Sequence, residues 1–364
     1  MANSPIPEAR SVPQNDVLFI FIPYDIPHKW VQDVQSHRPG LEVRWHNSMN
    51  ADKSLIPVES IDPALWQGVT LLCTYVPPPA DLIPLVRFVQ LASAGSDLWY
   101  SHPSFRKQDV TFCTANGIHP PQIAEWVIGS WLSYQHHLAK YLRDMNYGRW
   151  ENLYESPVEE SRGKRMGILG YGAIGREVTR LATALGMQVV CYTRNQRTTL
   201  PSRRDSSFCV PGTGDPDGLL PVAWFSGTDK ESVNYFLDQS LDILVIWLPL
   251  THETRHIFAY KQSQILGKHK TFLCNVGRGG HVDHGALLDA LQTGLIPGAA
   301  IDVTDPEPLP KDHSLWNAPR LLITPHVSWK SNAYWPRVLD LLAQNLRNLE
   351  EQKTPLNLVN RDIH

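Results

Sequence analysis

Residues 163–194 read GKRMGILGYGAIGREVTRLATALGMQVVCYTR, in which a glycine-rich turn separates two apolar runs. The run before the turn, 166–169, predicts a β-strand, and 174–185 predicts an apolar helix that ends near Gly186. A second strand over 187–192 completes the pattern. A GxGxxG turn in this strand–turn–helix–strand context predicts a dinucleotide-binding βαβ unit of the Rossmann type.

Each glycine of the turn has a predicted task. Gly170 permits the tight turn, Gly172 lets the backbone approach a diphosphate, and Gly175 lets the helix pack closely on the strand. The diphosphate is expected at the helix N-terminus, where free N–H groups favour negative charge. The alternative is a glycine turn that binds no ligand. The predicted cofactor-binding residues of this turn are Gly170, Tyr171, Gly172, Ala173, Ile174 and Gly175.

The end of the second strand distinguishes the two nicotinamide cofactors. An NAD site usually places Asp or Glu there to bind the adenosine ribose. This chain has Thr193 instead, followed by Arg194 and then Arg197. A hydroxyl and two guanidinium groups suit a ribose 2′-phosphate, which favours NADP(H) and leaves NAD(H) possible. The alternative is that both arginines are solvated loop charges.

Length, charge and apolar content exclude several classes of protein. A length of 364 residues suggests two domains. The 33 basic and 36 acidic residues give a net charge of −3, which argues against a nucleic-acid binder. No apolar run is long enough to predict a membrane span. The 5 cysteines are widely spaced and form no disulfide framework, so we expect a reducing, cytoplasmic compartment.

Strand-like and helix-like runs alternate along the chain, which predicts an α/β fold with parallel sheets. A long helix is expected from Ile123 to about Trp150, and an amphipathic one from Asn332 to about Glu351. Residues 195–230, rich in proline and glycine, look like an inserted loop outside the core. The predicted strands are 17–22, 41–45, 69–73, 88–91 and 111–113, then 165–169, 188–192, 242–248, 271–276, 298–302 and 321–324.

Three later segments suggest a catalytic set. Arg278 stands among glycines directly after a strand, Glu307 lies between two prolines, and His326 follows another strand. Arginine can bind a carboxylate or polarise a carbonyl, while a carboxylate can orient an imidazole that moves one proton. Each of these residues taken alone would more simply be structural.

These segments resemble the D-isomer-specific 2-hydroxyacid dehydrogenases, and more closely a fungal-type, glyoxylate/hydroxypyruvate reductase-like branch. The matching motifs are NVGRGGHVD at 275–283, DVTDPEP at 302–308 and TPH at 324–326, together with the glycine turn. The resemblance implies that Arg278, Glu307 and His326 are the catalytic triad. It also implies that the backbone N–H groups of Ala94 and Gly95 hold a substrate carboxylate, with further cofactor contacts from Leu248, Pro249, Thr254, Val276, Gly277, Asp302 and Ser328.

We therefore expect an α/β protein with two doubly wound parallel-sheet domains. Residues 1–118 with 336–364 form a flavodoxin-like substrate domain, and residues 119–335 form the inserted NAD(P)-binding domain. The expected reaction interconverts a small 2-oxoacid and a D-2-hydroxyacid by hydride transfer with NADPH. By resemblance, the long helix after Ile123 forms a homodimer. The alternative function is a dinucleotide-sensing, corepressor-like binding protein of the same fold.

Several other patterns are weighed and set aside. Residues 252–256 read HETRH, a formal zinc motif, but they follow a strand and Pro249 where a helix would be required, so no metal is expected. The pair His281 and His284 and the pair at 136–137 are expected on helix or loop surfaces. Trp329, bulky for its position, either shapes the substrate pocket or packs between domains.

Overall fold

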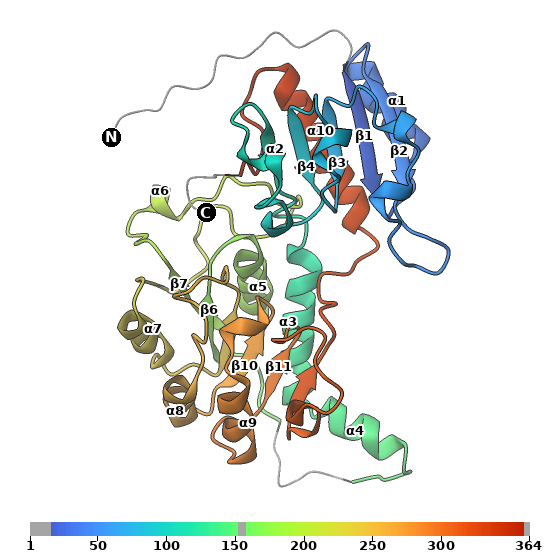
Figure 1. The fold of residues 1–364 in the computed structure, drawn as a ribbon. Helices are drawn as coiled ribbons and strands as arrows, with labels where there is room; N and C mark the ends of the chain where they lie inside the picture. The colour runs from blue at the N-terminus through green and yellow to red at the C-terminus, as the bar shows by residue number, and fades with distance from the viewer. Residues whose placement is uncertain (1–15, 152–157, 360–364) are drawn as a thin grey trace. The chain divides into compact units, whose positions relative to one another are not determined.

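The computed structural model describes residues 16–151 and 158–359, which divide into two compact units. One unit contains the described residues up to Ile118 and those from Asn332 onward, and the other is His119–Ser331. Each unit is built on its own parallel sheet (Figure 1). Within the described ranges, no helix combines the length and apolar character that crossing a membrane requires.

The first unit has five parallel strands in the order β2-β1-β3-β4-β5, which is the flavodoxin-like order. Aromatic side chains such as Phe19, Trp66 and Phe112 form a core on this sheet. The indole of Trp30 on α1 donates to the carbonyl of Leu339 on α10, which ties the two helices together. The elements are β1 (Val17–Ile22), α1 (His28–His37), β2 (Glu42–Asn47), β3 (Leu71–Thr74), β4 (Phe88–Leu91), α2 (Pro103–Arg106), β5 (Thr111–Cys113) and α10 (Tyr334–Glu350).

The second unit has seven parallel strands in the order β12-β11-β10-β9-β6-β7-β8, the Rossmann order extended by one strand. Helices α3 and α5 pack in one core, while α7, α8 and α9 pack in another, so both faces of the sheet are covered. The strands are β6 (Arg165–Leu169), β7 (Gln188–Thr193), β8 (Ala223–Ser226), β9 (Ile243–Ile246), β10 (Phe272–Asn275), β11 (Ala299–Ile301) and β12 (Leu321–Ile323). The helices are α3 (Pro120–Gln135), α4 (Leu138–Met145), α5 (Ala173–Ala184), α6 (Leu200–Arg203), α7 (Lys230–Leu237), α8 (Tyr260–Lys268) and α9 (His284–Gln292).

The two doubly wound sheets confirm the predicted fold class, but two local predictions are wrong. The long helix after Ile123 is broken into α3 and α4, because His137 adopts a left-handed backbone with φ 54° that no α-helix can continue through. The loop predicted over 195–230 contains β8, which pairs in parallel with β7, and the short helix α6. Trp224 and Phe225 of β8 therefore belong to the sheet.

Candidate functional site

The glycine turn after β6 has the geometry that its sequence predicts. Gly170 has φ +102°, and a Cβ there would lie 1.8 Å from the carbonyl oxygen of Trp247. A Cβ on Gly175 would lie 2.4 Å from the carbonyl oxygen of Gly170, whereas a Cβ on Gly172 would meet nothing within 4 Å. No side chain caps the N-terminus of α5 at Gly172. The close packing behind the turn and the open space before an uncapped helix fit a dinucleotide diphosphate.

The loop that begins at the carboxyl end of β7 carries three candidate phosphate ligands, which are Thr193, Arg194 and Arg197. The hydroxyl of Thr193 donates to the carbonyl of Asn195 at 2.8 Å, and Arg197 donates to the carbonyl of Ser202. Arg194 is exposed. Of these three candidate phosphate ligands, two therefore also shape their own loop.

Thr254 organises the loop after β9. Its hydroxyl donates to the carbonyl of Pro249 at 2.7 Å and accepts from the N–H of Thr251 at 2.8 Å. The HETRH segment at 252–256 lies in this loop as turns rather than as a helix. The hydrogen bond from Thr251 lowers the pKa of the Glu253 carboxyl, and the Arg194 guanidinium lowers it further. Arg194 is thus within electrostatic reach of the β9 loop.

Arg278 follows β10 and is held by a buried histidine. The Arg278 N–H donates to Nδ1 of His281 at 3.2 Å, and Nε2 of His281 lies 3.4 Å from the carbonyl of Pro249. The Arg278 guanidinium donates to the carbonyl of Gly277 at 2.9 Å. A Cβ on Gly277 would lie 3.1 Å from the His281 ring. Since Nδ1 accepts, Nε2 carries the proton of a neutral imidazole that joins the β9 and β10 loops.

Asp302, directly after β11, fixes the turn that carries His326. Its buried carboxylate accepts the hydroxyl of Thr324 at 2.5 Å and the N–H groups of Val327 and Ser328, both at 2.9 Å. The His326 N–H donates to the Asp302 carbonyl at 2.8 Å. This carboxylate, predicted to contact the cofactor, is already engaged within the protein.

Glu307 and His326 are brought into contact by the turn. Oε2 of Glu307 lies 3.0 Å from Nδ1 of His326, and Oε1 accepts the N–H of Thr304 at 3.0 Å. His326 has a left-handed backbone with φ 52°, and both side chains of the pair are partly exposed. A carboxylate on Nδ1 fixes the ring orientation and leaves Nε2 as the nitrogen that can exchange a proton with a ligand.

The segments carrying Gly170, Arg278 and His326 follow parallel strands of one sheet and therefore meet at its carboxyl edge, where ligands of open α/β sheets bind. A family model for the D-isomer specific 2-hydroxyacid dehydrogenase, NAD binding domain, matches residues 128–208 and 222–328, more than half of the chain. The chain belongs to this family. It is an NAD(P)-dependent oxidoreductase acting on 2-oxoacids or 2-hydroxyacids. Residues 209–221 lie outside the match.

Full-length relatives agree with the family. Glyoxylate/hydroxypyruvate reductase A of Enterobacter sp. (strain 638) is 27% identical over 362 residues, covering 96% of this chain and 99% of that protein. A family protein from Aeromonas salmonicida shares the fold, with TM-score 0.72 and 24% identity over 95% of this chain and 99% of that one. The family member from Xanthobacter autotrophicus Py2, solved with NADPH and MES, has TM-score 0.69 and 25% identity over 95% and 98%.

The remaining candidate residues lie in structured loops. In the first unit, the hydroxyl of Ser93 donates to the Gly95 carbonyl at 2.7 Å, which holds the turn containing Ala94. In the second unit, the indole of Trp329 donates to the His326 carbonyl at 2.8 Å and the ring packs against the core around α3. Trp329 therefore supports the His326 turn within its own unit.

Sequence reasoning missed the role of His281, which was expected at a surface. The side chain is fully buried, and His284 is half-buried beside His313. The signal that could have found His281 is its position inside the 275–283 motif, next to the turn glycines, where a ring can reach only the neighbouring backbone. His136 is exposed, as expected.

His281 should make the protein sensitive to acid. Burial, with the charges of Arg278 and Arg255 adding to it, lowers the pKa of His281 from 6.5 to about 4. Below pH 6.5 the unfolded chain binds a proton that the folded chain does not, so the free energy of unfolding falls as the pH drops towards 4. At pH 4.5 this loss amounts to about 2 kcal/mol relative to pH 7.

Urea unfolding of the wild type and of His281→Asn at pH 7 and pH 4.5 measures the effect. The variant keeps an acceptor for the Arg278 N–H but cannot titrate, so its stability should fall less between the two pH values. An equal fall in both proteins would contradict the prediction.

Proposed function

We propose that this protein is an NADPH-preferring reductase of small 2-oxoacids, which it interconverts with D-2-hydroxyacids. The observation that carries the proposal is the Glu307–His326 hydrogen bond of 3.0 Å, on loops at the same sheet edge as the Arg278 loop and the glycine turn. An orienting carboxylate, a proton-carrying imidazole and a nearby guanidinium form a set suited to reducing a carbonyl beside a carboxylate.

In this proposal each side chain has one task. Arg278 binds the substrate carboxylate and stabilises the negative charge that develops on the keto oxygen. His326 donates the proton on Nε2 to that oxygen, while Glu307 holds the ring through Nδ1 and stabilises its positive charge. In the reverse direction Nε2 takes the hydroxyl proton. NADPH, when bound, supplies the hydride.

The cofactor residues divide into two groups. The turn from Gly170 to Gly175 would hold the diphosphate, and Thr193, Arg194 and Arg197 would surround a ribose 2′-phosphate. Leu248, Pro249, Val276, Gly277 and Ser328 follow the other strands at the same edge and remain candidates for the nicotinamide end. Asp302 and Thr254 are further candidates at this edge, and their side chains also fix the loops that carry them.

The two units take different roles in the proposal. His119–Ser331 is the nucleotide-binding domain, and the unit with the five-stranded sheet is the substrate domain. In the latter, the backbone N–H groups of Ala94 and Gly95 are the candidates for holding the substrate carboxylate. Glyoxylate and hydroxypyruvate are the first substrates to test, because a relative that matches over 96% of this chain and 99% of its own length is named for them.

Removing the proposed acid should stop turnover without stopping cofactor binding. His326→Gln keeps a polar side chain but cannot exchange a proton, so kcat for glyoxylate or hydroxypyruvate should fall about 10²–10⁴-fold while the Kd for NADPH changes little. Nucleotide absorbance and nucleotide fluorescence measure the two quantities.

The matched control is His269→Gln, since His269 also faces a carboxylate, Asp238 at 3.2 Å, but follows α8 at the opposite sheet edge. This variant should keep wild-type kcat. If His326→Gln stays within tenfold of the wild type, the assignment of the acid is wrong. If the wild type binds NADPH tightly but reduces no oxoacid, the dinucleotide-sensing alternative gains support.

Arg194 should determine much of the cofactor preference. Arg194→Asp replaces a proposed 2′-phosphate ligand with the carboxylate typical of NAD sites. The ratio of kcat/KM for NADPH over NADH should fall by about 10-fold or more, which corresponds to loss of one charge-assisted contact. Arg162→Asp is the control, because Arg162 is exposed and precedes β6, at the opposite edge of the sheet. An unchanged ratio in Arg194→Asp would remove Arg194 from the site.

We also propose that two copies pair through α4. Its exposed apolar side chains Leu138, Tyr141, Leu142 and Met145 follow the i, i+3, i+4, i+7 spacing of one helix face. Leu142 and Met145 are 64% and 74% exposed, which is unfavourable for a face that stays in water.

Charges on that face should separate the copies. Leu142→Glu with Met145→Glu should convert a dimer into a monomer in sedimentation velocity, whereas Tyr235→Glu, at an exposed position on α7, should not. A wild type that sediments as a monomer at micromolar concentration would contradict the pairing.

A further inference from the structure

The segment between β7 and β8 is fastened to the glycine turn. The hydroxyl of Tyr171, the second residue of the turn, donates to Oδ2 of Asp215 at 2.7 Å. The Asp215 carboxylate also accepts the N–H groups of Leu219 at 3.0 Å and Leu220 at 3.1 Å. Burial and the Asp215 carboxylate raise the pKa of the Tyr171 hydroxyl, so it remains a donor. Asp215 is only 6% exposed, which makes this bond an interior one.

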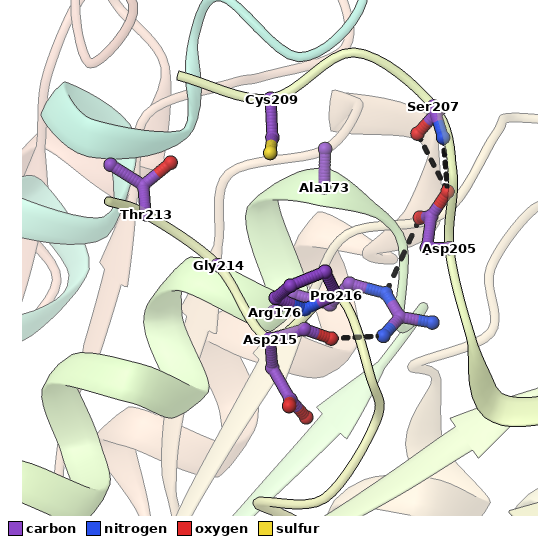
Figure 2. A pocket seen from close by; sticks show the side chains of 9 residues that line it. All are labelled: Ala173, Arg176, Asp205, Ser207, Cys209, Thr213, Gly214, Asp215 and Pro216. Carbon is purple, nitrogen blue, oxygen red and sulfur yellow. Dashed lines mark hydrogen bonds and ion pairs between the residues drawn. The ribbon is translucent and has the colours of Figure 1, made fainter. Parts of the chain in front are cut away.

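Arg176 in the first turn of α5 forms a second attachment. Its guanidinium lies 4.9 Å from the centre of the Tyr171 ring and donates to the carbonyls of Asp215 and Arg203. It also pairs with the carboxylate of Asp205 at 3.3 Å. Figure 2 shows Arg176 reaching both Asp205 and Asp215, which lie on separate stretches of the segment. One buried cation therefore gathers two parts of the segment against the helix.

Glu177 completes the attachment from the next position of α5. Its carboxylate, 2% exposed, accepts the N–H of Gly214 at 2.6 Å, and Nη2 and Nε of Arg180 donate to it at 2.7 and 2.8 Å. Buried charges of this kind are stable only when they are paired and hydrogen-bonded. The segment is therefore a fixed wall on the helix and not a loosely attached loop.

This wall encloses a small pocket at the start of α5. Ala173, the first residue of α5, lines the pocket with Arg176, and the segment contributes Ser207, Cys209 and Thr213 (Figure 2). The same segment carries Arg197, Arg203 and Arg204 shortly after Thr193. Its contacts thus link the turn that would hold a diphosphate to the loop that would hold a ribose phosphate.

We propose that residues 195–222 form a binding wall for the adenosine-phosphate end of the dinucleotide, and that Asp215 is the residue that positions this wall through Tyr171. The inference rests on the proposed use of NADPH. Residues 209–221, which include Asp215, lie outside the family match, whereas residues 195–208 of the wall lie within it.

The test measures binding of adenosine 2′,5′-bisphosphate to the full-length protein by calorimetry, without substrate. Asp215→Ala and Tyr171→Phe should each raise the Kd about 10-fold or more, and the double variant should be little weaker than Asp215→Ala alone, because the bond that Tyr171→Phe removes is already lost there. Asp238→Ala is the control, since Asp238 follows α7, outside the segment, and pairs at the surface with Lys268 at 3.2 Å. Its Kd should stay within about twofold of the wild type.

Turnover separates positioning from general damage. At saturating NADPH, kcat of Asp215→Ala should stay within about threefold of the wild type while KM for NADPH rises. Unchanged Kd values with a lowered melting temperature would overturn the proposal and leave Asp215 a purely structural residue. If the wild type binds adenosine 5′-monophosphate more tightly than the 2′,5′-bisphosphate, the NADPH preference fails. The wall is then judged by the Kd of the monophosphate in the same variants.

Discussion

All seven strands of the second unit run parallel, and the candidate site depends on this alignment. A parallel strand must be reached by a crossover connection, so every strand ends at the same edge of the sheet. Gly170 after β6, Arg278 after β10 and His326 after β12 are far apart in the sequence but share that edge. The connectivity of the strands therefore brings the candidate site residues together, because each strand is followed by a loop at this edge.

Loops at such an edge need internal support, and here buried polar groups supply it. Asp302 holds the His326 turn through three donors, and His281 joins the Arg278 loop to the β9 loop. Leaving any of these buried groups unpaired would cost about 1–3 kcal/mol, so the loops are held in one arrangement. The hydrogen-bonded side chains of Glu307 and His326 can stay partly exposed because the groups that support their loops are buried.

Most strands of the two sheets could be predicted from the sequence for a physical reason. Strands of a parallel sheet are buried on both faces and read as continuous apolar runs, as at 17–22 and 165–169. β8 escaped notice because it is an edge strand, partly exposed at every position and preceded by proline and glycine. The break at His137 also had no signal, since a left-handed residue in a helical pattern depends on the packing at either side.

Side-chain contacts between segments that are distant in the sequence were the feature of the site that the sequence predicted least well. Asp302 was predicted to contact the cofactor, but nothing in its local pattern indicated the hydrogen bonds that its carboxylate accepts from Thr324, Val327 and Ser328. His281 was predicted at a helix or loop surface, but its side chain is buried and its Nε2 lies 3.4 Å from the carbonyl of Pro249. For both residues the sequence indicated the correct loop. The groups that each side chain contacts lie on a second loop, which the local sequence pattern does not describe.

The buried charges between α5 and the segment before β8 are contacts of this kind, which the sequence does not predict but which hold the segment in place. Arg176, Glu177 and Asp215 are each at most 6% exposed, and burying charges is costly even when they are paired. Apolar side chains of similar size often stabilise a protein as well or better at such positions. Stability alone therefore does not explain three buried charges beside a glycine turn. Hydrogen bonds of fixed direction do explain them, because they hold a long insertion in one register where apolar contacts would let it slide.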